Sequence, residues 1–276
     1  MFPTPTAIAA RRAAFRQLHA SGCFVIPNPW DVGSAHWLAQ LGFKALASTS
    51  SGAAWSQGCA DGQMPLPAVL AYLRALVAAT ELPVNADFES GFADSPEGVA
   101  QNVRAAIDTG IAGVSIEDST GDAAQPLFDL PTGVARLRAA RAVIDASGQD
   151  VMLIGRAENF VAGRPDLDDA MARLKAYADA GADCLYAPGI TTREQIAAVV
   201  AAVAPKPVNV LVGSASAWTV ADLAALGVRR VSVGGGLARA AWGGFQRAAR
   251  QLAEQGRFDG FEGAVPGHEL NQRMGS

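Results

Sequence analysis

The sequence has few of the residues that mark a disulfide-rich, nucleic-acid-binding or membrane protein. Its 276 residues include three cysteines, 17% charged residues and a formal net charge of −4. The cysteines lie far apart and form no CxxC pair, which favours a reducing, cytoplasmic location. Without a Lys/Arg run no nucleic-acid partner is expected, and without a continuous apolar stretch neither a signal peptide nor a membrane span is expected. A small molecule is the expected partner.

The repeated order of apolar runs and helical segments predicts the fold. After an N-terminal helix within residues 1–22, the chain repeats eight times a short apolar run, a turn and an Ala/Leu-rich segment of helical period. Several helical segments end where a C-cap requires a left-handed residue, at Gly42, Gly110, Gly181 and Gly227. The expected strands are 23–27, 44–49, 83–88, 113–118, 151–158, 184–188, 207–212 and 230–234.

Eight such units, with strands apolar on both faces, favour an α/β fold of the (β/α)8 TIM-barrel type, formed as a single domain by residues 1–276. A doubly wound open sheet uses the same units. The barrel is preferred because the units number eight without a remainder and because no GxGxxG follows the first strand. Residues 257–276 fall outside the repeat and are expected to form a tail or an oligomer contact.

Charged side chains gather at the ends of the third, fourth and fifth expected strands, where a barrel carries its active site. Converging carboxylates repel one another unless a cation joins them, and an all-oxygen set favours Mg²⁺ or Mn²⁺ over zinc. The arginine among them could hold a substrate carboxylate bidentately. These side chains are Asp87, Glu89, Glu117, Asp118, Arg156 and Glu158.

Structural roles compete with these functional ones. An acidic residue after a strand is often the N-cap of the next helix, but Asp94 or Ser95 is the better cap after the third strand. Asp87 and Glu89 are thus left without a structural role, whereas Arg156 could simply neutralise its acidic neighbours. The stretch VSVGGGLARA could bind phosphate through backbone N–H groups or form only a tight turn. The scattered cysteines and histidines give little support to a Ser-His-Asp or Cys-His hydrolase.

From NPWDVGSA to LARAAWGGF the chain resembles the isocitrate lyase and phosphoenolpyruvate mutase superfamily. ADFESGF is similar to the family's D-x-D/E-x-G motif on strand 3, GVSIEDS to its I-E-D on strand 4, and IGRAENF to its Arg-acidic pair on strand 5. The resemblance implies a Mg²⁺-dependent barrel. In it Asp87 would bind the metal directly, Glu89 and Glu117 would stand in its water-mediated shell, and Arg156 would contact the substrate.

The resemblance also implies a substrate-carboxylate loop at STSSG and an acidic residue, Asp61, on the mobile loop after strand 2. Thr49, Ser50 and Ser51 would offer hydroxyl and N–H groups, and Asp87 would lie beside the substrate as well as the metal. Members are usually homotetramers in which the last helix is exchanged between subunits. The candidate for exchange is GGFQRAARQLAEQG, in a tetramer or dimer.

Two family motifs are missing. Lyases acting on isocitrate or methylisocitrate carry K-[KR]-C-G-H after the I-E-D, and the phosphonomutases carry a gating loop with Lys and Asn. Here the region reads EDSTGDAAQPLFDL, without Cys, Lys or His. Cleavage of isocitrate or methylisocitrate by the usual mechanism is therefore not expected.

The motifs that remain predict a Mg²⁺-dependent lyase that cleaves a C–C bond of a small 2-oxo or 2-hydroxy acid through a pyruvate-like enolate. Asp61, Glu117 or a metal-bound water could be the general acid or base. Decarboxylation or hydrolysis of oxaloacetate and P–C chemistry on phosphonopyruvate are alternatives on the same site. A barrel that only binds an oxo acid is the alternative of another class.

Overall fold

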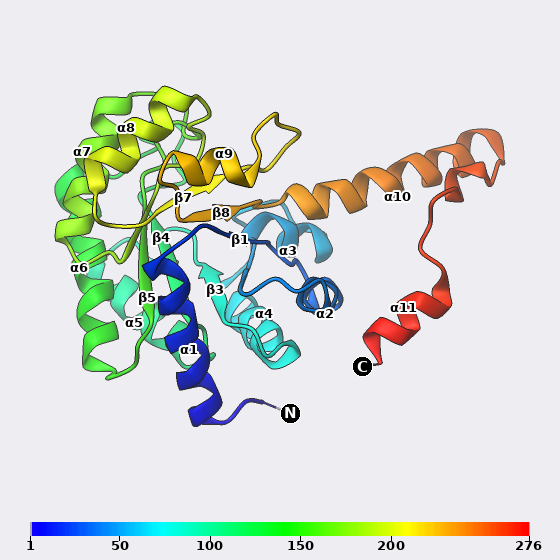
Figure 1. Ribbon diagram of the computed structural model, residues 1–276, viewed down its shortest axis with the longest axis horizontal. Coiled ribbons are helices and arrows are strands. Elements are labelled where there is room, and N and C mark those ends of the chain that lie inside the picture. Colours follow the sequence, from blue (N-terminus) through cyan, green and yellow to red (C-terminus); the bar gives the residue numbers. More distant parts are fainter. Residues whose placement is uncertain (1, 276) are drawn as a thin grey trace.

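The computed structural model describes residues 2–275, which form a parallel eight-stranded barrel surrounded by helices (Figure 1). The strands follow one another in the order β1-β8-β7-β6-β5-β4-β3-β2. All eight expected strands are confirmed, each shorter than its predicted range. They are β1 Phe24–Ile26, β2 Leu46–Ala47, β3 Val84–Asp87, β4 Gly113–Glu117, β5 Met152–Arg156, β6 Cys184–Tyr186, β7 Val208–Leu211 and β8 Arg230–Ser232.

The helices that surround the barrel begin and end at local signals in the sequence. The four predicted C-cap glycines all have positive φ, and Ser95 caps α5 by accepting a hydrogen bond from Gly98 N. No helix within residues 2–275 combines the length and apolar character needed to cross a bilayer. The helices are α1 Pro5–Ala20, α2 Val32–Gln40, α3 Ser50–Ser56, α4 Leu66–Ala79, α5 Pro96–Ile107, α6 Leu130–Ala146, α7 Leu167–Asp179, α8 Arg193–Val203, α9 Val220–Ala225, α10 Gly236–Gln255 and α11 Gly267–Met274.

The seam between β1 and β2 is closed by fewer bonds than the other strand pairs. Ala47 N donates to Pro27 O at 3.0 Å, just beyond β1. Asn28 reinforces this seam, because its Nδ2 donates to Ser48 O while its Oδ1 accepts from the backbone N–H groups of residues 233 and 234. One buried amide therefore fastens the ends of β1, β2 and β8 to one another.

Helix α1 covers the N-terminal end of the barrel. Its Phe15 packs into the barrel interior with Ala45, Met152 and Cys184. Arg12 of the same helix donates to Ile107 O, at the end of α5, at 3.0 Å and to Ile111 O, just before β4, at 2.8 Å. The interior is thus filled and covered at this end, and a cavity can open only toward the other.

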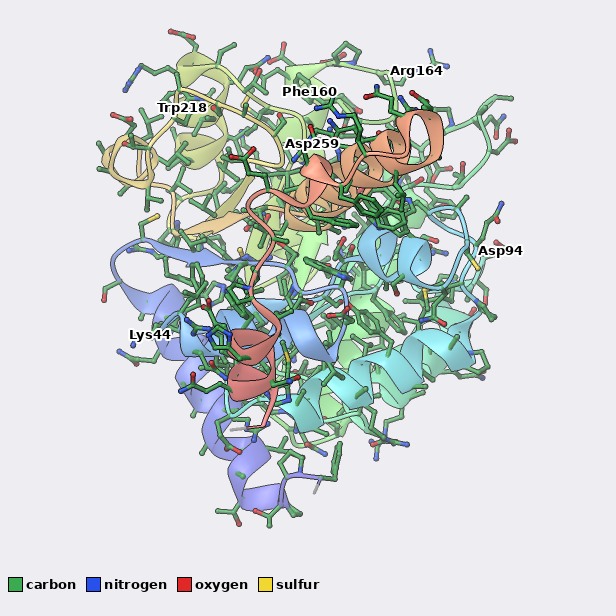
Figure 2. The ribbon with its side chains drawn as sticks, turned by 90° about the vertical axis from the view of Figure 1, so that its right-hand side faces the viewer. Lys44, Asp94, Phe160, Arg164, Trp218 and Asp259 are labelled. Atoms are coloured by element: carbon green, nitrogen blue, oxygen red, sulfur yellow. The ribbon has the colours of Figure 1, made fainter. Side chains whose placement is uncertain are left out.

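The C-terminal segment forms an arm. Figure 1 shows α10 extending away from the barrel and α11 returning toward α2, and Asp259 marks the far end of the arm in Figure 2. The guanidinium of Arg273 lies 4.3 Å from the ring centroid of Trp37 on α2, and Gln40 Nε2 donates to Arg273 O. The segment expected as a tail therefore contains a 3-10 turn, Asp259–Phe261, and a docked helix.

Replacing Gly113 with alanine tests the packing beneath α1. A Cβ at this position would lie 2.6 Å from Asn85 Oδ1 and 2.7 Å from Phe15 Cε1, both of them buried. Gly113→Ala is expected to lower the free energy of unfolding by about 1–3 kcal/mol, measured by denaturant titration. Gly267→Ala, where a Cβ meets nothing within 4 Å, is the control and should change it little. Equal effects of the two substitutions would contradict this account.

Candidate active site

A cavity of about 280 Å³ opens among the C-terminal ends of the strands. Asp94, Phe160 and Trp218, labelled in Figure 2, lie on the loops that follow β3, β5 and β7 at this end. A larger open hollow of about 1010 Å³ lies between the loops after β4 and β5, but none of the predicted site residues lines it. The smaller cavity is the candidate active site, since its lining includes Thr49, Ser50, Ser51, Asp61, Asp87 and Arg156. The other two predicted residues, Glu89 and Glu117, are not among the residues that line it.

Arg156, at the end of β5, lies at the centre of the charged residues. Its Nη1 is 2.6 Å from Asp87 Oδ1, its Nη2 is 3.1 Å from Glu117 Oε2, and its Nε is 2.9 Å from Glu158 Oε1. Its guanidinium also lies 5.0 Å from the ring centroid of Tyr186. Burial opposes the charge of Arg156, but the three carboxylates outweigh burial and raise its pKa. One cation thus joins the ends of β3, β4 and β5.

Asp87 is oriented by backbone as well as by Arg156. Its Oδ2 accepts a hydrogen bond from Ser50 N at 3.0 Å, and its own N–H donates to Ser48 Oγ at 2.8 Å. The next side chain, Phe88, turns away from the cavity and is fully buried. The end of β3 is therefore fixed to the start of α3, with the Asp87 carboxylate in the cavity wall.

The other acidic side chains carry more negative charge than Arg156 can neutralise. Glu89 has φ +46° in the turn after β3, a left-handed conformation that is uncommon outside glycine. Burial, then Asp87 and Asp61, raise its pKa to about 7. Burial also raises the pKa values of Glu117, Glu158 and Asp61. Raised carboxyl pKa values of this kind indicate a place where additional positive charge is favourable.

The donor set fits a hydrated divalent cation. Within residues 2–275 no three His, Cys, Asp or Glu side chains gather closely enough to hold a metal by themselves. Mg²⁺ typically keeps several waters and binds through one or two carboxylates, which suits direct binding by Asp87 and water-mediated binding by Glu89 and Glu117. The uncompensated carboxylates are the observation that favours this fit. The assignment of these three residues to Mg²⁺ or Mn²⁺ stays a prediction.

The STSSG segment is the beginning of α3 rather than an open turn. Thr49 caps this helix, because its Oγ1 accepts from Gly52 N at 3.3 Å, and it also lies 3.1 Å from Ser51 Oγ. Ser50 N–H, expected to face the substrate, donates to Asp87 instead. Asp61 lies on the exposed loop between α3 and α4, yet it borders the cavity.

Asp118 faces away from the cavity. Its Oδ2 accepts from Tyr177 OH at 2.6 Å and Arg173 Nη1 at 3.0 Å, and its Oδ1 accepts from Glu158 N at 2.8 Å. Asp118 therefore anchors α7 and fixes the backbone of Glu158. Glu117 ends β4 and lies beside Arg156, whereas Asp118, the next residue, forms its ion pair with Arg173.

The glycine-rich stretch after β8 is closely packed. The N–H groups of Val233 and Gly234 donate to Asn28 Oδ1. A Cβ on Gly235 would lie 2.8 Å from Ser51 Oγ, and one on Gly236 would lie 2.9 Å from the backbone oxygen of residue 213. Close approach of neighbouring backbone and side chains accounts for these glycines, in agreement with the tight-turn interpretation.

The sequence interpretation missed the polar residues deeper in the cavity. They lie within strands, two positions before a predicted site residue or on strands 6 to 8, where no site residue was predicted. The signal that could have found them is the period of two, which places alternate strand residues on the inner side of the barrel. These residues are Asn85, Ser115, Tyr186, Arg230 and Ser232.

The charge of Glu89 gives a testable pH dependence. Because folding raises its pKa from 4.5 to about 7, the folded state should lose stability as the pH rises through this interval. In the presence of a chelator, Glu89→Gln is expected to raise the melting temperature relative to wild type at about pH 8 and to change it little at about pH 5. Glu254→Gln, at an exposed position on α10, is the control. The same effect of Glu89→Gln at both pH values would contradict this.

Comparisons with known proteins identify the family of the chain. The family model described as phosphoenolpyruvate phosphomutase matches residues 15–253. A crystal structure from Burkholderia cenocepacia J2315, described as a lyase/mutase, is 48% identical, with a TM-score of 0.94 and coverage of 98% of each chain. An uncharacterized protein of Mycobacterium tuberculosis is 34% identical over 80% of this chain and 81% of its own length. An oxaloacetate decarboxylase of Bradyrhizobium sp. is 31% identical over 81% of this chain and 77% of its own.

These matches cover the barrel, and relatives of the chain include lyases, hydrolases and mutases. The eight-stranded fold and the charged strand ends agree with that relationship. The chain is an enzyme that belongs to the phosphoenolpyruvate phosphomutase family, within the isocitrate lyase and phosphoenolpyruvate mutase superfamily.

Proposed function

We propose that this enzyme is a Mg²⁺-dependent lyase that cleaves a C–C bond of a small 2-oxo or 2-hydroxy acid through a pyruvate-like enolate. The observation that carries the proposal is the position of Arg156, which contacts Asp87, Glu117 and Glu158 beside a cavity of about 280 Å³. A fixed guanidinium beside several carboxylates suits a reaction in which negative charge develops on one substrate oxygen. It is less suited to covalent catalysis, because no Cys or His among residues 2–275 lines the cavity and its serine hydroxyls therefore lack a histidine base.

Oxaloacetate is the first substrate to test, because a relative aligned over most of both chains is named oxaloacetate decarboxylase. Loss of its C4 carboxylate as CO₂ would leave the electron pair of the broken C3–C4 bond on the enolate of pyruvate, and one proton added at C3 would complete the reaction. When bound, Mg²⁺ would supply positive charge beside the 2-oxo oxygen. Arg156 would bind the substrate carboxylate and stabilise the same developing charge.

Asp61 is the better candidate for the proton donor. It borders the cavity from an exposed loop that a proton can reach, and partial burial of its carboxyl raises its pKa, a shift in the direction that suits a proton donor. Glu117 also has a raised pKa but lies 3.1 Å from Arg156, which favours its ionised form. Glu117 therefore suits the charge balance around Arg156, and Asp61 suits proton transfer.

The loop after β4 supports a reaction that does without the family's cysteine. It folds back on itself through a bridge between Ser119 and Leu127 and a hydrogen bond from Phe128 N to Asp118 O. Its residues line the outer hollow rather than the central cavity. Decarboxylation needs no acid from this loop, whereas cleavage of methylisocitrate by the usual mechanism does.

Asp87→Asn tests the metal-dependent part of the proposal. The substitution keeps the size of the side chain but removes its charge, so Mg²⁺-dependent release of pyruvate should fall by about a hundredfold or more. Pyruvate is measured with a panel of oxaloacetate, phosphonopyruvate, methylisocitrate and dimethylmalate, with and without Mg²⁺. Calorimetry measures Mg²⁺ and oxalate binding in parallel.

Asp94→Asn is the matched control, because Asp94 is an exposed acid seven residues further along. It should leave both pyruvate release and oxalate binding unchanged. If Asp87→Asn bound Mg²⁺ and oxalate like wild type, the metal-dependent lyase would be ruled out. Oxalate binding without turnover of any panel member would favour a barrel that only binds oxo acids.

We also propose that α10 packs against another copy of the chain in a homotetramer or dimer. Within this helix of 20 residues only Ala238 is buried, while Trp242 and Phe245 are 44% and 63% exposed. Aromatic side chains gathered on a helix that extends from the barrel are typical of a subunit contact. A second copy could cover them with its own α10.

Phe245→Asp tests this contact by placing a charge on the exposed aromatic face. The variant is expected to elute from size-exclusion chromatography with light scattering at a smaller mass than wild type, with an unchanged far-UV CD spectrum. Gln246→Asp adds the same charge at a polar position of the same helix and should keep the wild-type mass. A monomeric wild type would contradict the proposed oligomer.

A further inference from the structure

Arg230, the first residue of β8, is a buried cation without an acidic partner. Only 3% of it is exposed. Its Nε donates to Asn209 Oδ1 at 2.8 Å, and within residues 2–275 no ion pair joins it to a carboxylate and no acceptor lies within hydrogen-bonding distance of its Nη1. Burial lowers its pKa, as expected for a charge withdrawn from water without compensation.

The side chain borders the candidate active-site cavity. Arg156, Tyr186, Asn209 and Arg230 face one another in register on the four neighbouring strands β5 to β8. On its other side Arg230 pairs with Phe24, the first residue of β1, which packs against the cluster of Phe15, so Arg230 contributes to the deep part of the cavity. We call this part the cavity floor and define it by Asn85, Ser115, Arg230 and Ser232.

Hydrogen bonds beside the cavity floor fix the orientation of the Arg230 guanidinium. Asn209 accepts from Arg230 Nε and donates its Nδ2 to Ser232 Oγ at 2.9 Å, so this amide is fixed on both sides. Asn85 Oδ1 is a second buried polar atom of the floor without a partner within residues 2–275. Asn85 Oδ1 lies near Gly113 and Phe15 at the filled end, so the unpartnered Nη1 of Arg230 is the group whose hydrogen bonds a ligand or water would complete.

Other buried arginines of the chain have clear structural partners. Arg173 contacts Asp118 and Asp169, whereas Arg12 and Arg136 each donate to two backbone oxygens. The partner of Arg230 is a single side-chain amide, that of Asn209. A buried charge without a counterion is costly, and an apolar residue of similar volume would fill the same space without that cost. The guanidinium is therefore explained better by an anion that enters the cavity than by the packing of the barrel.

We propose that Arg230 binds a second anionic group of the substrate, a carboxylate, at the cavity floor. The 2-oxo or 2-hydroxy acid end lies beside Asp87 and Arg156, and the second carboxylate reaches Arg230. The enzyme then selects dicarboxylic over monocarboxylic acids of the same head group. This inference rests on the proposed function, because it assumes that the acid head group binds at the strand ends.

Malate and lactate separate the two parts of the site. They share the 2-hydroxy acid head, and only malate has a second carboxylate. Calorimetry in the presence of Mg²⁺ compares their binding to wild type and to Arg230→Met, with oxalate as the probe of the head-group end. Wild type is expected to bind malate about 10- to 100-fold more tightly than lactate, the range for hydrogen bonds to a charged group. Arg230→Met should bind the two acids about equally and should keep its oxalate affinity.

Thermal melting distinguishes a ligand-binding role from a structural one. Arg230→Met removes an uncompensated buried charge, so its melting temperature should equal or exceed that of wild type. Arg173→Met is the control, since it leaves Asp118 buried without its cation and should melt at a lower temperature. Malate should raise the melting temperature of wild type more than that of Arg230→Met.

Three outcomes would overturn the proposal. One is a wild-type protein that binds malate and lactate equally. Another is an Arg230→Met variant that keeps the wild-type preference for malate. The third is a variant that melts early and loses oxalate as well, which would mean that Arg230 supports the fold. Failure of wild type to bind oxalate with Mg²⁺ would instead refute the proposed function, and the inference with it.

Discussion

The ion pairs of Arg156 hold the mouth of this barrel together. A guanidinium carries N–H donors that point in several directions within one plane. Here three of its nitrogens contact the carboxylates of Asp87 at the end of β3, Glu117 at the end of β4 and Glu158 just after β5. Without this cation the same carboxylates would repel one another at the point where three strands leave the core. With it, they remain close and still carry an excess of negative charge, which is the condition under which a divalent cation binds.

The rest of the barrel keeps these strand ends in place. Asn28 joins β1, β2 and β8 at the mouth, and Asp118 fixes α7 on the outside of β4. At the opposite end, α1 fills the barrel with Phe15. Apolar packing thus fills one end of the barrel, and the polar side chains that join strands or line the cavity are collected at the other end.

The fold and the outer part of the site could be predicted because their signals are local. Each strand and helix is marked by its own apolar period, and glycines such as Gly110 end helices through a single backbone conformation. Asp87, Glu117 and Arg156 stand out because a charged residue closes an apolar run. The partners of these residues could not be predicted in the same way. That Ser50 N–H binds Asp87 depends on how β2 and β3 align, which no local pattern specifies.

The residues of the cavity floor could not be predicted for the same reason, and they change the expected distribution of charge in the site. Arg156 has three carboxylates around it, whereas Arg230 has none. The cavity is therefore electrostatically uneven, with excess negative charge at the strand ends and an uncompensated positive charge at the floor. A cation at the first end and an anionic group at the second would each lower the electrostatic energy of the protein. A dicarboxylic acid that chelated the cation with its oxo-acid end would supply the anionic group as well, so the proposed binding of such an acid would also set its orientation.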